Sequence, residues 1–167
     1  RYMTTHGANW NNIPLSVAEY TIGDYLRPLG LRKALVGKTH MAADAEGMAR
    51  LGVERNSELG VLLSECGFEP FERDDGLHPS ESADPNLAYN RHLRAQGYDG
   101  PNPWHGWANS AAGPNGEILS GWQMRHAPLP ARVRPEHSET AYMTGRAMDF
   151  IEDAGQMSHP GQRRQLG

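Results

Sequence analysis

"TIGDYLRPLGLRKALVGKTHM", residues 21–41, is the stretch of sequence that decides the predicted fold. Thr21 has the residue type of a helix N-cap, and Asp24 is placed to bond back to it as in a capping box. Apolar residues follow at helical spacing up to Gly30, which is suited to end the helix. Residues 31–36, LRKALV, predict a short and partly buried strand. A helix, a glycine and a strand in this order are typical of an α/β fold.

The rest of the chain predicts regular elements only in places. Residues 44–51 favour a short helix, and a longer helix is expected between Ser138, suited to be its N-cap, and Gly155, suited to end it. Residues 67–134 carry turn signals with little periodicity, so we expect a long loop-rich region that covers or lines a site. The last helix has an apolar stripe typical of core packing, formed by Met143, Ala147, Phe150, Ile151 and Ala154.

The composition limits the class of protein. With 167 residues the chain has the length of one ordinary domain with a sizeable core. Its hydrophobic content of 38% is low, and 19 glycines and 12 prolines predict a large share of loop. A formal net charge of −4 without a block of like charge indicates neither nucleic acid nor an anionic membrane as a partner. No apolar run approaches the roughly 20 residues of a membrane span.

The sequence says little about localisation. Cys66 is the single cysteine, which rules out an internal disulfide and favours a reducing compartment such as the cytoplasm. No secretory leader is visible, but the sequence opens on Arg1 rather than on a methionine, so the natural start is expected upstream. Localisation therefore stays open, with the cytoplasm favoured.

Lys38 and His40 stand two residues apart directly after the predicted strand. If the backbone stays extended past Gly37, both side chains point the same way from the carboxyl end of the strand, where open α/β sheets bind ligands. An ammonium beside an imidazole suits a tetrahedral oxyanion such as a sulfate or phosphate ester. The alternative is that Lys38 simply extends into water and His40 caps a loop, and spacing alone favours that alternative.

Residues 21–41 resemble a segment of the sulfatase family, in which a helix ending in glycine is followed by a strand and the motif GKxH. Upstream, RYMTTHG resembles the GRYxxxHG that follows the nucleophile motif of that family. Downstream, ECGFEPFERDDGLHP and SETAYMTGRAMDFIE are similar to segments of its arylsulfatase and phosphonate monoester hydrolase branch. The resemblance covers about residues 1–154.

The resemblance implies an α/β fold, part of an alkaline phosphatase-like three-layer α/β/α sandwich with a long loop-rich insertion. Family members cleave sulfate esters, and some relatives cleave phosphate or phosphonate esters, with a formylglycine nucleophile beside a divalent metal cation. By resemblance, Lys38 would bind the oxyanion of the ester, and His40 would hydrogen-bond the formylglycine hydroxyls. Some phosphonate hydrolase relatives replace both residues. Their presence therefore favours a sulfatase, a sulfuric ester hydrolase, over a phosphonate monoester or phosphodiester hydrolase.

Other parts of the family pattern are not found in the sequence. The nucleophile motif, C-x-P/A-x-R, is expected upstream of Tyr2, and Cys66 does not fit it because neither a proline nor an arginine follows at the right spacing. The metal ligands of the family are also expected outside this chain. A divalent cation of the Ca or Mn type would therefore be held by residues of the parent enzyme, and we assign no metal ligand here.

These departures lead to a prediction of domain organisation. We expect residues 1–155 to be an interior part of the catalytic domain and residues 156–167 to be a divergent or disordered tail. The family's later histidine is expected soon after the last helix, but the pattern is lost after Gly155, so His159 is not given that role. The chain alone is expected to be inactive.

The loop-rich middle supplies candidates for substrate binding. Trp104 and His105, with Trp107, Trp122 and His126 farther along, could wall a pocket for an aromatic or apolar leaving group. The alternative is ordinary burial in a core or subunit interface, since tryptophan is the largest apolar side chain.

Other polar residues are expected to be structural. His6 in the HG motif is expected to serve packing or a turn. Asp74, Asp75 and His78 could bind a cation, but a solvated turn is favoured because too few ligands are local.

Two classes of function follow. In the first, the chain is part of a metal-dependent ester hydrolase that acts on a small sulfate, phosphate or phosphonate ester. In the second, it is a non-catalytic truncated domain that binds an anion or a partner chain. A homo-oligomer is compatible with either, whereas nucleic acid and membrane are not expected as partners.

Overall fold

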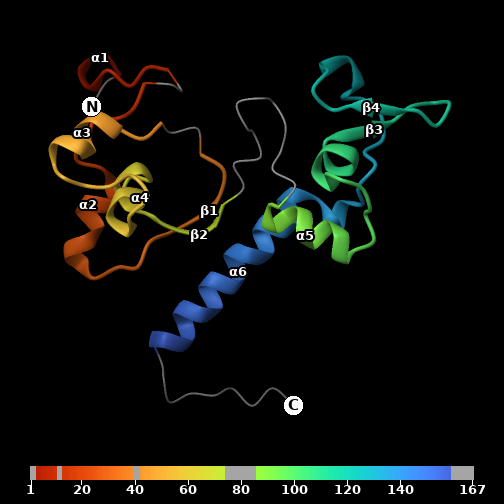
Figure 1. Ribbon diagram of the computed structural model, residues 1–167. Coiled ribbons are helices and arrows are strands. Elements are labelled where there is room, and N and C mark those ends of the chain that lie inside the picture. Colours follow the sequence, from red (N-terminus) through yellow and green to blue (C-terminus); the bar gives the residue numbers. More distant parts are fainter. Residues whose placement is uncertain (1–2, 11–12, 40–41, 74–85, 159–167) are drawn as a thin grey trace. The chain divides into compact units, whose positions relative to one another are not determined.

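The computed structural model describes residues 3–10, 13–39, 42–73 and 86–158. The chain divides into two compact units, Arg1–Arg73 and Asp74–Gly167, and each is described by itself (Figure 1). Both units contain helices and strands, which agrees with the predicted α/β class.

The first unit combines short helices with a pair of strands. In chain order its elements are α1 (Met3–His6), α2 (Ile22–Leu26), the 3-10 helix η1 (Arg27–Leu29), β1 (Ala34–Gly37), α3 (Ala45–Arg50), α4 (Glu58–Ser64) and β2 (Glu69–Arg73).

The helix predicted after Thr21 is confirmed, with its cap. The backbone N–H of Thr21 donates to Asp24 Oδ2 at 2.9 Å. The chain then tightens from α2 into η1, which contains Pro28 and ends at Gly30 with a φ of 68°. A left-handed residue at this position is the usual helix stop, and glycine adopts it at no steric cost.

α2 packs closely on the turn between α4 and β2. The Thr21 hydroxyl donates to the Cys66 carbonyl oxygen at 2.8 Å. A Cβ added at Gly23 would lie 2.1 Å from that same oxygen. Only glycine fits at this position without moving the backbone. The close approach of α2 to this turn therefore depends on Gly23.

β1 and β2 form a parallel pair (Figure 1). Their register pairs Ala34 with Glu69 and Gly37 with Arg73, with an irregularity between Leu35 and Val36. The prediction of a strand over 31–36 is therefore wrong at its start. Pairing begins three residues later because regular strand geometry here depends on β2, which the local pattern does not reveal.

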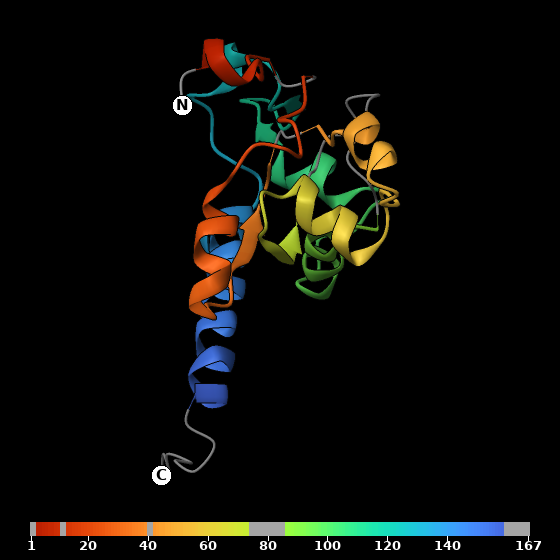
Figure 2. The same ribbon diagram turned by 90° about the vertical axis from the view of Figure 1, so that its left-hand side faces the viewer.

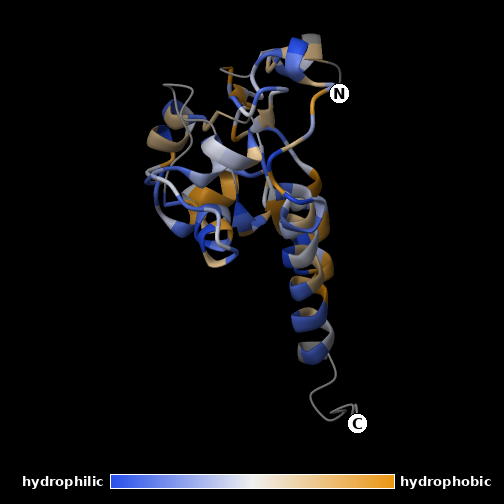
Figure 3. Ribbon diagram, turned by 90° about the vertical axis from the view of Figure 1, so that its right-hand side faces the viewer, coloured by the Kyte–Doolittle hydropathy of each residue, from blue (hydrophilic) through white to orange (hydrophobic). Residues whose placement is uncertain are grey.

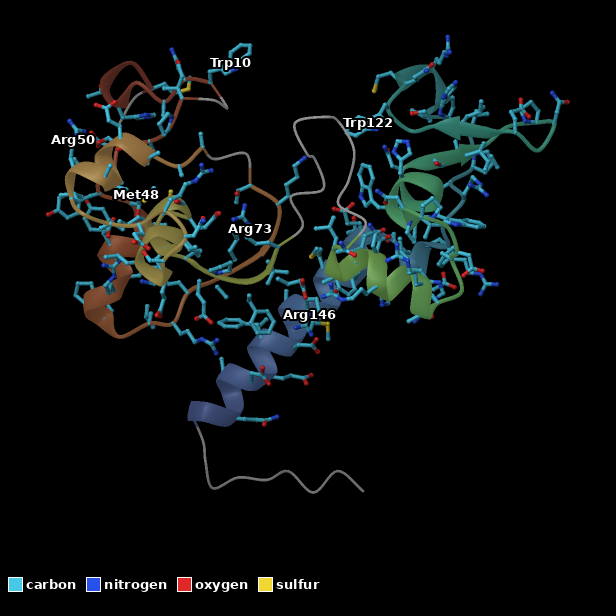
Figure 4. All side chains as sticks on the ribbon, viewed as in Figure 1. Trp10, Met48, Arg50, Arg73, Trp122 and Arg146 are labelled. Atoms are coloured by element: carbon cyan, nitrogen blue, oxygen red, sulfur yellow. The ribbon has the colours of Figure 1, made fainter. Side chains whose placement is uncertain are left out.

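Two capped helices precede β2. Asp44 caps α3 by accepting a hydrogen bond from the Gly47 N–H at 2.9 Å, as expected for a helix over 44–51. Ser57 caps α4, and a short turn leads from α4 to β2 (Figure 2). The side chain of Met48 in α3 is almost fully buried and is labelled in Figure 4.

The second unit contains most of the large buried side chains among the described residues. Its elements are α5 (Ala88–Ala95), the π-helix η2 (Trp104–Ala108), β3 (Ser110–Ala112), β4 (Ile118–Ser120), the 3-10 helices η3 (Met124–His126) and η4 (Pro135–His137), and α6 (Glu139–Ser158). β3 and β4 pair as an antiparallel hairpin.

The expectation of a mostly irregular region over 67–134 is thus wrong in part. It contains β2, α5, η2, β3 and β4, and a core forms there from Tyr89, Leu93, Tyr98, Trp104 and Val133. This region has little hydrophobic periodicity, and hydrogen bonds of a buried amide side chain connect its elements. Asn90, fully buried, accepts the Trp104 N–H at 2.6 Å and donates to Asn102 Oδ1 at 3.1 Å, which joins α5 to the start of η2.

α6 begins as predicted but ends later. Ser138 Oγ accepts from the Ala141 N–H at 3.2 Å, which confirms the cap. The helix continues through Gly155 to Ser158, because glycine lowers helix stability by only about 1 kcal/mol and cannot alone stop a helix. Hydrophilic and hydrophobic residues alternate along it (Figure 3). In the described part of the chain, no helix has the length and apolar character to cross a membrane.

Candidate functional site

The candidate site lies at the carboxyl ends of β1 and β2. Because the strands are parallel, their ends meet at the same edge. Lys38 and Thr39 follow β1, Arg73 is the last residue of β2, and Glu65 directly follows α4. Figure 4 labels Arg73 at this edge. Carboxyl ends of parallel strands are where open α/β sheets bind ligands.

Lys38 presents an available ammonium. Its side chain is exposed and has no hydrogen bond or ion pair with the residues that the structure describes. Lysine occurs at one other position in the sequence, and there the Lys33 Nζ donates to the Gly23 carbonyl at 2.9 Å. The two lysines therefore have different tasks: Lys33 joins α2 to β1, and Lys38 faces solvent beyond the strand.

His40 lies outside the described residues. The predicted convergence of its imidazole with the Lys38 ammonium therefore stays a prediction. Gly37, just before the site, has a φ of 109°, so the chain does not leave β1 in the ordinary extended geometry that the spacing argument assumed. The direction of Lys38 consequently depends on contacts made farther along.

Such contacts come from a buried ion pair that the sequence did not predict. Glu65, only 3% exposed, pairs with the Arg73 guanidinium through its Oε1. The Thr39 hydroxyl donates to Glu65 Oε2 at 3.3 Å and accepts from Arg73 Nη2 at 3.3 Å. Glu65 and Arg73 are 26 and 34 positions from Thr39 in sequence, and no local motif marks them as its partners.

Cys66 is next to this pair but is poorly suited to nucleophilic chemistry. Burial raises the pKa of its thiol, and the Glu65 carboxylate raises it further. A thiol with a raised pKa stays protonated near neutral pH, and the thiolate is the reactive form. This agrees with the expectation that Cys66 is not the nucleophile.

A cavity of about 410 Å³ lies within the first unit, with His6, Trp10, Asp24, Asp44 and Cys66 in its wall. Two acidic side chains of this wall, those of Asp24 and Asp44, accept hydrogen bonds from the backbone. Asp44 accepts the Val17 N–H at 3.0 Å as well as its cap bond, and these backbone bonds hold its pKa below the usual carboxyl value. Backbone and hydroxyl bonds from Thr21 and the nearby arginine and lysine charges likewise lower the pKa of Asp24.

The histidine in this wall is part of a turn. His6 Nδ1 accepts the Ala8 N–H at 3.2 Å, which is the turn-forming task expected of the HG motif. Trp10 beside it is 71% exposed and projects from the unit in Figure 4.

The described residues do not gather into a metal site. In the ranges that the structure describes, no three histidine, cysteine, aspartate or glutamate side chains gather closely enough to hold a cation. Asp74, Asp75 and His78 lie outside those ranges.

The predicted substrate-binding residues belong to the second unit. Trp104 is 8% exposed and packs in the core, where its Nε1 donates to Glu139 at 3.0 Å. His105 beside it is exposed. Trp104 is therefore a core residue, which was the alternative left open for the tryptophans. Contact of Trp104 or His105 with substrate stays a prediction.

The neighbouring aromatic residues also have structural partners. The Trp107 Nε1 donates to the Asp99 carbonyl at 2.8 Å, and the Arg132 guanidinium lies 4.1 Å from the centre of its ring. His126 Nδ1 lies 2.8 Å from the Ser120 carbonyl oxygen. Trp122 is 46% exposed at the end of the hairpin (Figure 4), so it is the tryptophan of this unit most accessible to a ligand.

Comparison with known proteins supports the fold. No protein-family model matches the sequence. Among solved structures, the chain is similar to a phosphonate monoester hydrolase, SpPMH, from Silicibacter pomeroyi, with a TM-score of 0.57 and 20% sequence identity. The match covers 98% of this chain and 28% of that enzyme, so the chain spans less than a third of its length. At this identity the likeness shows a shared fold.

Proposed function

We propose that the chain is part of a hydrolase of ester bonds and supplies the lysine that binds the oxyanion of the ester. One observation carries this proposal: Lys38 presents an exposed ammonium, without a partner in the described part of the chain, directly beyond the carboxyl end of a parallel strand. The shared fold with a phosphonate monoester hydrolase supports it.

The chemistry follows from charge. When a sulfate or phosphate ester is cleaved, negative charge develops on the leaving oxygen and stays spread over the equatorial oxygens of the transferred group. A fixed cation at that point stabilises the transition state, and preorganised electrostatic stabilisation of this kind often contributes more to catalysis than any other effect. Lys38 would bind one oxyanion oxygen, and the proposal assigns a second hydrogen bond there to His40.

The finer proposal is a sulfuric ester hydrolase of the formylglycine type, with the three-layer sandwich of the alkaline phosphatase-like superfamily. Its support is the GKTH motif, because some phosphonate hydrolase relatives replace the lysine and histidine. The divalent cation of such an enzyme would be bound by other parts of the parent protein, since the residues described here do not gather into a metal site.

A phosphonate monoester hydrolase is the second candidate, favoured by the activity in the name of the structural neighbour. The two candidates differ in the anion that the site prefers. Titration with inorganic sulfate and with methylphosphonate distinguishes them. Tighter binding of sulfate supports the sulfatase, and tighter binding of methylphosphonate replaces it with the second candidate.

The two lysines allow a direct test of the anion site. The chain is treated with an amine-acetylating reagent with and without inorganic sulfate, and modification of each lysine is read by mass spectrometry. Sulfate is expected to slow acetylation of Lys38 and leave Lys33 unchanged, because Lys33 is bonded within the fold. Equal rates at Lys38 with and without sulfate would contradict the proposal.

A substitution gives the affinity. Lys38→Ala is expected to weaken sulfate binding, measured by isothermal titration calorimetry because this variant has no Lys38 to acetylate, about 10- to 100-fold, the strength of a hydrogen bond to a charged group. Arg32→Ala is the matched control, because it removes an exposed cation that pairs with Glu69 at the other end of the strands. A similar loss in both variants would indicate nonspecific attraction, and no loss in Lys38→Ala would remove the site.

A further inference from the structure

The buried carboxylate of Glu65 at the sheet edge is energetically costly and calls for an explanation. The Glu65 side chain is 3% exposed and that of Arg73 is 31% exposed. Burial of a carboxylate is costly unless it is paired and hydrogen-bonded, and even a good pair is often no more stable than apolar side chains of the same size. Stability alone therefore explains this pair poorly, and its position beside Lys38 suggests a task in the site.

The contacts form a closed cycle. Glu65 binds the Arg73 guanidinium through Oε1 and the Thr39 hydroxyl through Oε2, and Arg73 Nη2 returns to that hydroxyl. The cycle links the ends of three segments: α4, β2 and the continuation of β1. Strand pairing joins Gly37 to Arg73, and the cycle extends this connection to Thr39 and to the end of α4.

The cycle also determines where Lys38 points. Thr39 is half-buried with its hydroxyl turned toward Glu65 and Arg73, whereas the preceding Lys38 is exposed. The two residues are adjacent in the chain, so the hydrogen bonds that hold the Thr39 side chain also fix the backbone from which the exposed Lys38 side chain leaves. Gly37 alone does not hold Lys38 in one direction, since glycine has more backbone freedom than any other residue, so contacts beyond it are needed.

We infer that Glu65 and Arg73 are positioning residues that act through Thr39 to hold the Lys38 ammonium at the oxyanion site. The inference rests on the proposed function of Lys38. It assigns Arg73 no contact with the anion: its charge is balanced by Glu65 across the ion pair, which leaves Lys38 as the uncompensated cation among the described residues of this edge.

Thr39→Val and Thr39→Ser test the link itself. Valine keeps the shape and removes the hydroxyl, whereas serine keeps the hydroxyl. Sulfate affinity, measured by the protection of Lys38 from acetylation, is expected to fall about three- to tenfold in Thr39→Val and to stay within about twofold in Thr39→Ser. Unchanged affinity in Thr39→Val, with its fold intact by circular dichroism, would overturn the inference.

Glu65→Gln separates positioning from direct binding by the sign of its effect. If Arg73 positions Lys38, loss of the carboxylate charge loosens the cycle and weakens sulfate binding. If Arg73 is instead an anion ligand, release from its carboxylate partner tightens sulfate binding, and the inference is overturned. If Glu65→Gln fails to fold, the comparison of Thr39→Val with Thr39→Ser still tests the positioning role.

The outcomes for Lys38→Ala keep the two proposals apart. If Lys38→Ala leaves sulfate binding unchanged, the proposed function fails and the inference falls with it. If Lys38→Ala weakens binding but Thr39→Val and Glu65→Gln do not, the oxyanion site stands and the positioning role alone is wrong.

Discussion

At the scale of single residues, His92 in α5 has a setting that depends on pH. Its Nε2 is buried without a hydrogen-bond partner in the described part of the chain. The ring of Tyr142 packs on it with centres 4.8 Å apart, and His137 lies edge-on at 6.3 Å. Burial lowers the pKa of His92, and the charge of a protonated His137 lowers it further. The fold therefore favours the neutral imidazole.

The sign of the linkage gives a prediction. A histidine whose pKa is lowered by folding contributes stability that is complete above its unfolded value of about 6.5 and is lost as the pH falls through that value toward the folded pKa. We expect the urea midpoint of the second unit, followed by tryptophan fluorescence, to decrease between about pH 7.5 and about pH 5.5. His92→Phe keeps the aromatic packing and is expected to flatten this decrease.

His105→Gln is the control for this prediction, because His105 is an exposed histidine of the same unit. It should lose stability with pH as the unchanged protein does. Parallel pH curves for His92→Phe and the unchanged protein would show that another group causes the acid sensitivity.

Sequence reasoning at this scale succeeds where the partner is local. Asp24 lies three residues from Thr21, and that spacing alone predicted their bond. Lys38 was singled out by its place after a strand together with the family resemblance, and its role in binding an anion stays a prediction. Glu65 and Arg73 were not, because their contacts to Thr39 arise only when distant segments fold together. The lysine of the candidate site could thus be proposed from the sequence, and the residues proposed to hold it could not.

At the scale of elements, the backbone conformation of Gly37 at the end of β1 affects the direction in which the chain continues. Gly37 has a φ of 109°, and an added Cβ would meet no atom of the described residues within 4 Å. A side chain there is therefore disfavoured by backbone conformation rather than by a clash, at a cost of about 1–3 kcal/mol. The backbone can relieve that strain by rotating, which would move Lys38.

Gly37→Ala is accordingly expected to weaken sulfate binding as well as stability. Gly30→Ala is the matched control: Gly30 also has a positive φ, 68°, and an open space at its Cβ position, but it lies at the end of η1. Both variants should lower the urea midpoint, and only Gly37→Ala should reduce the protection of Lys38 by sulfate. Equal protection in the two would show that Gly37 does not direct the lysine.

The elements that sequence reasoning found are those with local signals. α2, α3 and the start of α6 each have a side chain that caps the helix, and each was predicted. β2 was missed because its sequence, EPFER, contains a proline and charged residues, and its strand geometry comes from pairing with β1. α5 was missed because a buried amide, Asn90, occupies a core position that periodicity assigns to apolar residues.

At the scale of the whole molecule, burial is uneven between the two units. Of the buried apolar side chains in the described ranges, Met48 belongs to the first unit, and the aromatic cluster around Leu93 belongs to the second. Length and composition predicted one sizeable core but could not show where along the chain it would form. The place of this core depends on the packing together of α5, η2 and η4. The local sequence of these elements predicts them only weakly.

The uneven burial predicts an order of unfolding. Burial of apolar surface is the main source of folding stability, so the first unit should unfold at lower urea than the second. Acetylation of Lys33 reports the first unit, because its Nζ is bonded to Gly23 while α2 and β1 are folded. Tryptophan fluorescence reports mainly the second unit, since Trp10, the tryptophan of the first unit, is already 71% exposed. The Lys33 midpoint is therefore expected at lower urea than the fluorescence midpoint.

Leu93→Ala tests whether the units are separate in this respect. The side chain is fully buried, so truncation should cost about 2–5 kcal/mol. That loss should move the fluorescence midpoint to lower urea and leave the Lys33 midpoint in place, because each unit forms its contacts mainly within itself. A single transition seen by both probes, shifted as a whole by Leu93→Ala, would mean instead that the core of the second unit also stabilises the fold around Lys38. The oxyanion site would then depend on residues far from it in sequence.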